Sequence, residues 1–172
     1  QYRRLVVLGE PGSGKTTILR RLVYDYALAA QKDPEAPIPF FVPLNRYTGP
    51  EPALDYAATC AKELRPYLQT YLERGRAVLL LDGLNEMPRK EYKERVDRIQ
   101  KLLDDYQETL VVVTCRALDY VETLKLEKVD VKPLDRVQQQ EYLCRYLGAE
   151  RGDMLFWQLA GGDAGKELRW NL

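Results

Sequence analysis

The sequence predicts an α/β fold in which a parallel sheet lies between two layers of helices, and three observations support this prediction. Short apolar runs alternate with longer segments of helical periodicity along the 172 residues. The apolar runs are uninterrupted, as in strands that helices cover on both faces. The first run is followed at once by a glycine-rich turn and a helical segment. A chain of this length forms one domain, or one domain and the start of another.

Each element is predicted from its local pattern. The expected strands are 5–8, 40–42, 77–81, 110–113 and 128–131, and the expected helical regions are 15–30, 53–73, 92–103 and the part after residue 133. Pro66 interrupts the second helical region because proline cannot donate the internal hydrogen bond, and Gly75 is expected to cap its end. In such a fold, ligands bind at the carboxyl ends of the strands.

The run of charges between residues 89 and 98 is expected to be a solvated helix surface and not a binding patch. The apolar positions of the same helix fall on one face with a helical period. These positions are Tyr92, Val96, Ile99 and Leu103.

Composition excludes several classes of function. Lys and Arg number 26, as do Asp and Glu, so the chain lacks the positive charge of a dedicated nucleic-acid binder. No apolar run approaches the ~20 residues of a membrane span. Histidine is absent and Ser13 is the only serine, which excludes imidazole catalysis and leaves a serine hydrolase no nucleophile outside the glycine-rich turn. Cys60, Cys115 and Cys144 are dispersed, which predicts free thiols in a reducing, cytoplasmic compartment and no zinc site.

The glycine-rich turn after the first strand fits the pattern G-x-x-x-x-G-K-[ST] of a phosphate-binding loop, the P-loop or Walker A motif. Glycines let successive backbone N–H groups face a polyphosphate, and the helix N-terminus adds a partial positive charge. Lys15 supplies a charge for the β- and γ-phosphates, and the Thr16 hydroxyl can ligate Mg²⁺. The residues expected to bind nucleotide are Gly9, Glu10, Pro11, Gly12, Ser13, Gly14, Lys15, Thr16 and Thr17.

Two later strands end in charged residues that complete the expected site. The run 78–81 leads into Asp82, the pattern of a Walker B carboxylate that holds Mg²⁺ together with Thr16. Glu86 follows four residues later on a turn and is expected to orient the attacking water. Arg116 follows the fourth strand and is expected to meet the γ-phosphate. Glu86, Lys15 and Arg116 are therefore the predicted catalytic residues.

With these motifs the chain resembles the NACHT family of P-loop ATPases, within the STAND group of signal-transduction ATPases. The resemblance covers residues 3 to about 150 and rests on the segments 9–16, 41–44, 79–86, 112–116 and 131–134, of which D-G-L-x-E at 82–86 discriminates best. It implies a P-loop NTPase three-layer sandwich with strand order 5-1-4-3-2. It also implies an intracellular ATP/ADP switch with Mg²⁺, whose sensor and effector modules lie outside this domain. Asn85 departs from the family, which usually has an acidic residue there.

We therefore expect a NACHT-like nucleotide-binding domain at 1–133, the beginning of a helical subdomain at 134–172, and a piece of a longer protein. The expected function is a slowly hydrolysing ATP switch that controls conformation and self-association in the full-length protein. Two alternatives stay open at this point, a non-hydrolysing nucleotide-binding scaffold and an AAA+ motor domain. The AAA+ glutamate would stand next to the metal-binding aspartate, where this chain has Gly83. A GTPase is disfavoured because no Asn precedes a Lys.

Overall fold

The computed structural model describes residues 3–120 and 124–160. The chain divides into two compact units, residues 1–10 with 14–131 and residues 11–13 with 132–172. The first unit is an α/β sandwich and the second contains two helices. The predicted fold class, with its helical C-terminal part, is confirmed.

The sheet has five strands in the order β2-β3-β4-β1-β5, and every neighbouring pair is parallel. This confirms the predicted order, read from the other edge. The strands are β1 Arg4–Leu8, β2 Ile38–Pro43, β3 Ala77–Asp82, β4 Leu110–Cys115 and β5 Glu127–Asp130. The last strand thus begins one residue before the predicted range 128–131.

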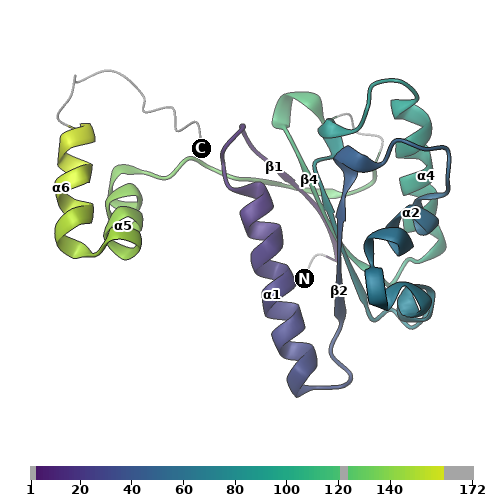
Figure 1. Cartoon of the computed structure of the whole chain (residues 1–172). Helices are drawn as coiled ribbons and strands as arrows, with labels where there is room; N and C mark the ends of the chain where they lie inside the picture. Colours follow the sequence, from purple (N-terminus) through teal and green to yellow (C-terminus); the bar gives the residue numbers. More distant parts are fainter. Residues whose placement is uncertain (1–2, 121–123, 161–172) are drawn as a thin grey trace. The chain divides into compact units, whose positions relative to one another are not determined.

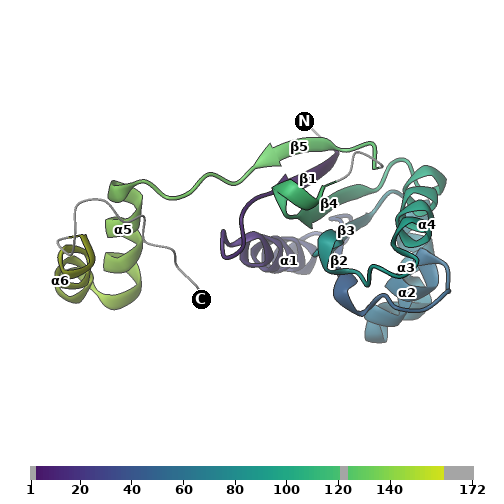
Figure 2. The same ribbon diagram turned by 90° about the horizontal axis from the view of Figure 1, so that it is seen from above.

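Helix α1 (Lys15–Lys32) covers one face of the sheet, and α2 (Ala53–Cys60), α3 (Leu68–Glu73) and α4 (Tyr92–Asp105) cover the other (Figures 1 and 2). The strand order explains this division. The connection from β1 to β2 runs across the sheet in one direction, and the connections from β2 to β3 and from β3 to β4 run in the opposite direction. Because such crossovers are right-handed, α1 lies on one face and α2, α3 and α4 lie on the other.

The side chains of β3 divide between the two faces by alternation. Leu79 and Leu81 pack in the larger core, together with Val96 and Ile99 of α4. Val78 and Leu80 pack against Leu19 of α1 in a smaller core. Because both faces are covered, β3 is apolar throughout, and this is why its range was predictable from sequence.

The helical region 53–73 breaks earlier than the predicted interruption at Pro66. Helix α2 ends at Cys60, and a 3₁₀-helix, η2 (Lys62–Tyr67), connects it to α3. Lys62 has a φ of 51°, a left-handed conformation that an α-helix does not accept. Pro66 lies inside η2, so it falls in a segment that has already left the α-helical path.

The predicted cap at Gly75 is confirmed. Gly75 has a φ of +62°, and its N–H donates to Leu72 O at 3.0 Å while Arg76 N–H donates to Tyr71 O at 2.8 Å. This pair of hydrogen bonds forms a Schellman motif, which ends α3 and directs the chain into β3.

The prediction that residues 89–98 form a solvated helix surface is wrong at one position. The apolar face of α4 is buried as predicted, but Arg95 is also buried, with 3% of its surface exposed. Arg95 lies one turn before Ile99 on the same helix, so it shares the core-facing side.

The second unit contains α5 (Arg136–Leu147) and α6 (Ala149–Ala160), packed against each other. A capping box starts α5, with Asp135 and Gln138 bonding each other's backbone N–H. A Cβ at Gly152 would lie 2.4 Å from the backbone N of Cys144, so the close approach of the two helices requires glycine there. In the part of the chain that the structure describes, every helix is too short or too polar to cross a membrane.

Candidate nucleotide-binding site

The residues predicted to act on nucleotide follow strands β1, β3 and β4, which lie side by side in the sheet. Leu8 pairs with Cys115, and Leu81 pairs with Val113. Because the strands are parallel, their carboxyl ends meet at one edge. That edge therefore carries Asp82 and Arg116 beside the start of the turn that follows β1.

The turn between β1 and α1 uses glycine for its backbone conformation. Gly12 and Gly14 have φ values of 76° and 84°, in the region that residues with a Cβ rarely adopt. A Cβ at Gly14 would meet no atom within 4 Å, so conformation rather than space requires glycine there. Gly14 is the N-cap of α1, and its carbonyl accepts the N–H of Ile18 at 2.9 Å.

Lys15 lies at the first position of α1 and folds back onto the turn. Its Nζ donates to the carbonyl of Gly9 at 2.9 Å and to that of Glu10 at 2.7 Å. Burial lowers the pKa of Lys15, and the positive charge of Arg116 lowers it further, while Glu10 and Glu86 act in the opposite direction. The charge of Lys15 thus interacts with the charges of both other predicted catalytic residues, Glu86 and Arg116.

Asp82 is held by two hydroxyl groups from different elements. Its Oδ1 accepts from Thr16 Oγ1 at 3.1 Å and from Thr114 Oγ1 at 2.7 Å. Thr114 Oγ1 also accepts the backbone N–H of Gly83 at 2.8 Å. The structure therefore joins the two predicted metal ligands, Thr16 and Asp82, directly, whereas Thr17 is exposed.

The oxygen atoms of Thr16 and Asp82 form a donor set that fits Mg²⁺. This ion prefers oxygen ligands and usually takes only one or two from the protein, the rest coming from phosphates and water. Within residues 3–120 and 124–160 no cluster of three or more Cys, Asp or Glu side chains could hold a metal without such help. The pair therefore fits an ion that takes few of its ligands from the protein.

Asn85 links the end of β3 to the end of β4. Its Oδ1 accepts the backbone N–H of Arg116 at 3.0 Å. Asn85 lies in the 3₁₀-helix η3 (Leu84–Glu86), which Gly83 opens with a φ of 77°. The amide thus fixes the backbone from which the Arg116 side chain extends, and does so without a negative charge.

Glu86 is exposed and its side chain lies back over Gly83. A Cβ at Gly83 would lie 3.0 Å from the carboxylate of Glu86, so glycine leaves the room that this carboxylate occupies. Cys115, by contrast, is fully buried, and burial raises the pKa of its thiol to about 11. It is a neutral core residue and not a nucleophile.

The roles of Thr114 and Asn85 in these hydrogen bonds were not predicted from the sequence. Thr114 is a strand residue with a β-branched side chain, and nothing in its pattern distinguishes it from Val111 or Val113 as a packing residue. One signal was available: it is the only hydroxyl in the strand 110–115, one residue beyond Val113, which pairs with Leu81 before Asp82. Finding it requires the strand order first.

The fold is similar to that of solved structures whose sequences differ widely from this one. The ORC1 protein of Aeropyrum pernix, solved in complex with DNA, is similar with a TM-score of 0.54 and 18% identity, over 97% of this chain and 56% of that chain. A STAND protein of Pyrococcus horikoshii with a tetratricopeptide repeat sensor is similar with a TM-score of 0.47 and 18% identity, over 94% of this chain and 26% of that chain. This chain therefore spans about half of the former and a quarter of the latter.

No curated protein matches the sequence. The model of one family, the NACHT domain, matches residues 3–150, which is most of the chain. The match includes the glycine-rich turn, Asp82, Glu86 and Arg116. The chain belongs to the NACHT domain family.

Proposed function

We propose that this chain is the Mg²⁺-dependent, ATP-binding and slowly hydrolysing switch module of a larger signalling protein. The observation that carries the proposal is the contact of Thr16 Oγ1 with Asp82 Oδ1 at 3.1 Å. It brings together a hydroxyl from the start of α1 and a carboxylate from the end of β3, the two protein ligands that a nucleotide-bound Mg²⁺ uses in P-loop enzymes.

Each predicted site residue has a role in this proposal. Residues 9–17 surround the phosphates with N–H groups, and Lys15 exchanges the carbonyls of Gly9 and Glu10 for the β- and γ-phosphates. Thr16 and Asp82 hold Mg²⁺, which neutralises charge on the phosphates. Glu86 orients the attacking water, and Arg116 meets the γ-phosphate and registers its loss.

The parts of the protein outside the nucleotide site belong to the same proposal. Residues 134–172 are proposed as the beginning of a helical subdomain, of which 161–172 lie outside the described residues. Cytoplasmic sensor and effector domains of the same protein complete the proposal. ATP favours self-association of the full-length protein by binding one of two conformations more tightly than the other. The balanced charge of this domain supports a protein partner rather than nucleic acid.

Calorimetric titration of Lys15→Ala with ATP and Mg²⁺ tests the proposal. Removing a charged donor to phosphate should weaken binding by about 1.5–3 kcal/mol, which is about 10- to 150-fold in Kd. Lys32→Ala, at the opposite end of the same helix, is the matched control and should bind like the parent. Unchanged ATP affinity in Lys15→Ala would refute the site.

A further inference from the structure

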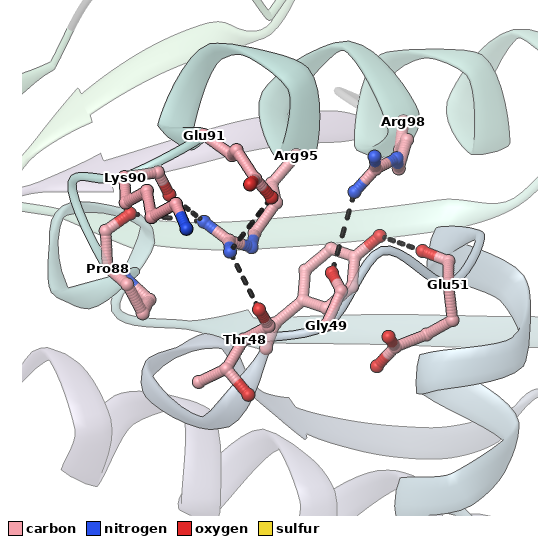
Figure 3. Close-up of polar contacts among 9 residues, drawn as sticks. Thr48, Gly49, Glu51, Pro88, Lys90, Glu91, Arg95 and Arg98 are labelled. Atoms are coloured by element: carbon pink, nitrogen blue, oxygen red, sulfur yellow. Dashed lines mark hydrogen bonds and ion pairs between the residues drawn. The ribbon is translucent and has the colours of Figure 1, made fainter.

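Arg95 is a buried cation that the nucleotide site does not use directly. It lies on the core-facing side of α4 with 3% of its surface exposed. Figure 3 shows its guanidinium between two segments without regular structure, one containing Thr48 and the other containing Pro88 and Lys90. These segments follow β2 and β3, so they lie at the carboxyl edge of the sheet where the nucleotide site is located.

The guanidinium donates to backbone carbonyls of both segments. Nη1 donates to Pro88 O at 3.2 Å and to Lys90 O at 2.5 Å, and Nη2 donates to Thr48 O at 2.7 Å. The nearest ion pair is with Glu91, at 3.8 Å between Nη2 and Oε2. One side chain therefore fixes three carbonyls from two loops (Figure 3).

Stability alone is a poor explanation for an arginine at this position. Burying a cation is costly, and an apolar side chain of similar volume often stabilises a core as well or better. Arg95 Nε is also buried without a hydrogen-bond partner among the described residues. What the arginine provides, and an apolar side chain cannot, is a set of directed bonds to loop backbone.

The loop that Arg95 holds is the one that follows Glu86. Residues 87–91 connect η3 to α4, and the loop ends at Glu91 with a φ of 57°, an unfavourable conformation outside glycine. Met87 is buried, with 3% exposed. The backbone that follows Glu86 is therefore anchored by the burial of Met87 and by the bonds from Arg95 to Pro88 and Lys90.

We propose that Arg95 is a positioning residue for Glu86, which it holds by bonding the following loop to the loop after β2. The proposal rests on the proposed function, because it concerns the carboxylate that orients water in ATP hydrolysis. It assigns Arg95 a role in the rate of hydrolysis and none in the affinity for ATP. Water-mediated phosphoryl transfer depends strongly on position, so a small displacement of Glu86 lowers the rate.

The test is a double-mutant cycle of Arg95→Met and Glu86→Gln, measured as single-turnover hydrolysis with saturating ATP and Mg²⁺. Arg95→Met should lower the rate about 10-fold in the parent and less than about 2-fold in the Glu86→Gln background, because the two changes remove the same contribution. The Kd for ATP should stay within about 2-fold of the parent. Arg95→Lys, which keeps the charge but not the planar fork, should show an intermediate rate.

Arg98→Met is the matched control. Arg98 lies on the same helix and contacts the loop after β2 through Gly49 O at 3.5 Å. The Arg98→Met protein should hydrolyse ATP like the parent. The proposal would be overturned if Arg98→Met lost as much rate as Arg95→Met. It would also be overturned if Arg95→Met had the same effect in both backgrounds, or if neither Arg95 variant folded. If Glu86→Gln lowers the rate of hydrolysis and Arg95→Met does not, only the role of Arg95 is overturned. A Glu86→Gln protein with the parent's rate removes the proposed hydrolysis mechanism as well.

Discussion

At the scale of single residues, the position of Asp82 depends on a side chain that continues the contact between two strands. The paired residues of β3 and β4 end with Leu81 and Val113. Beyond this pair, Thr114 Oγ1 connects the two chain segments, because it accepts the N–H of Gly83 and donates to Asp82 Oδ1. A hydroxyl can do both, because it is a donor and an acceptor at once.

Thr114→Val should therefore lower the free energy of unfolding by about 1–3 kcal/mol, because Val has nearly the same shape but leaves the buried N–H of Gly83 unpaired. Thr114→Ser, which keeps the hydroxyl, should retain most of the stability. Urea unfolding followed by circular dichroism measures both variants. Equal stability of Thr114→Val and the parent would show that the two hydrogen bonds contribute nothing.

The role of a residue was predictable from sequence where its place at the end of one strand was enough to assign it. Asp82 and Arg116 follow apolar runs, and their place at a strand end is visible in the sequence. Thr114 and Arg95 were missed because their partners come from neighbouring strands and loops. Arg95 has the same appearance in sequence as its solvated neighbours, and its burial follows only from its place one turn before Ile99 on the face of α4 that packs on the sheet.

At the scale of elements, the strands were predictable and one helical region was not. β3 is apolar at every position from Ala77 to Leu81 because helices cover both of its faces, so its pattern is unambiguous. The region 53–73 carries one sequence signal for a break, Pro66, but the chain leaves the α-helical conformation already at Lys62, whose φ is 51°. Local propensity does not predict that break.

Gly75→Ala should destabilise the protein by about 1–2 kcal/mol, because the αL conformation that ends α3 is unfavourable for a residue with a Cβ. Gly75→Asn is the matched control, since Asn places the same Cβ near Glu108 but tolerates this conformation. Thermal unfolding of the three proteins separates backbone conformation from crowding. If both variants lose stability equally, the cause is crowding by Glu108, whose Cβ would lie 3.1 Å from a Cβ at position 75.

Across the whole molecule, three acidic groups are buried or half-buried in their neutral form. Burial raises the pKa of Cys115 to about 11 and that of Tyr92 to about 12, and it also raises the pKa of Tyr56. Above pH 9 the unfolded chain loses these protons before the folded protein does. The folded state then binds more protons, so its stability must fall as the pH rises.

The free energy of unfolding should accordingly decrease above pH 9, by about 1.4 kcal/mol per pH unit for each group that ionises only in the unfolded chain. Urea unfolding at a series of pH values from 7 to 11 measures the slope. Cys115→Ala should reduce the slope between pH 9 and pH 11. A flat profile across that range would mean that these groups are hydrated in the folded protein.

We propose that this site binds ATP with Mg²⁺ and hydrolyses it slowly, with Glu86 orienting the water. Single-turnover hydrolysis by the parent and by Glu86→Gln, with ATP affinity measured on the same samples, tests it most directly. Glutamine keeps the shape and hydrogen bonding of Glu86 but cannot take a proton, so ATP should bind as before while hydrolysis falls by about 100-fold or more. A Glu86→Gln protein that hydrolyses ATP as fast as the parent would contradict the account.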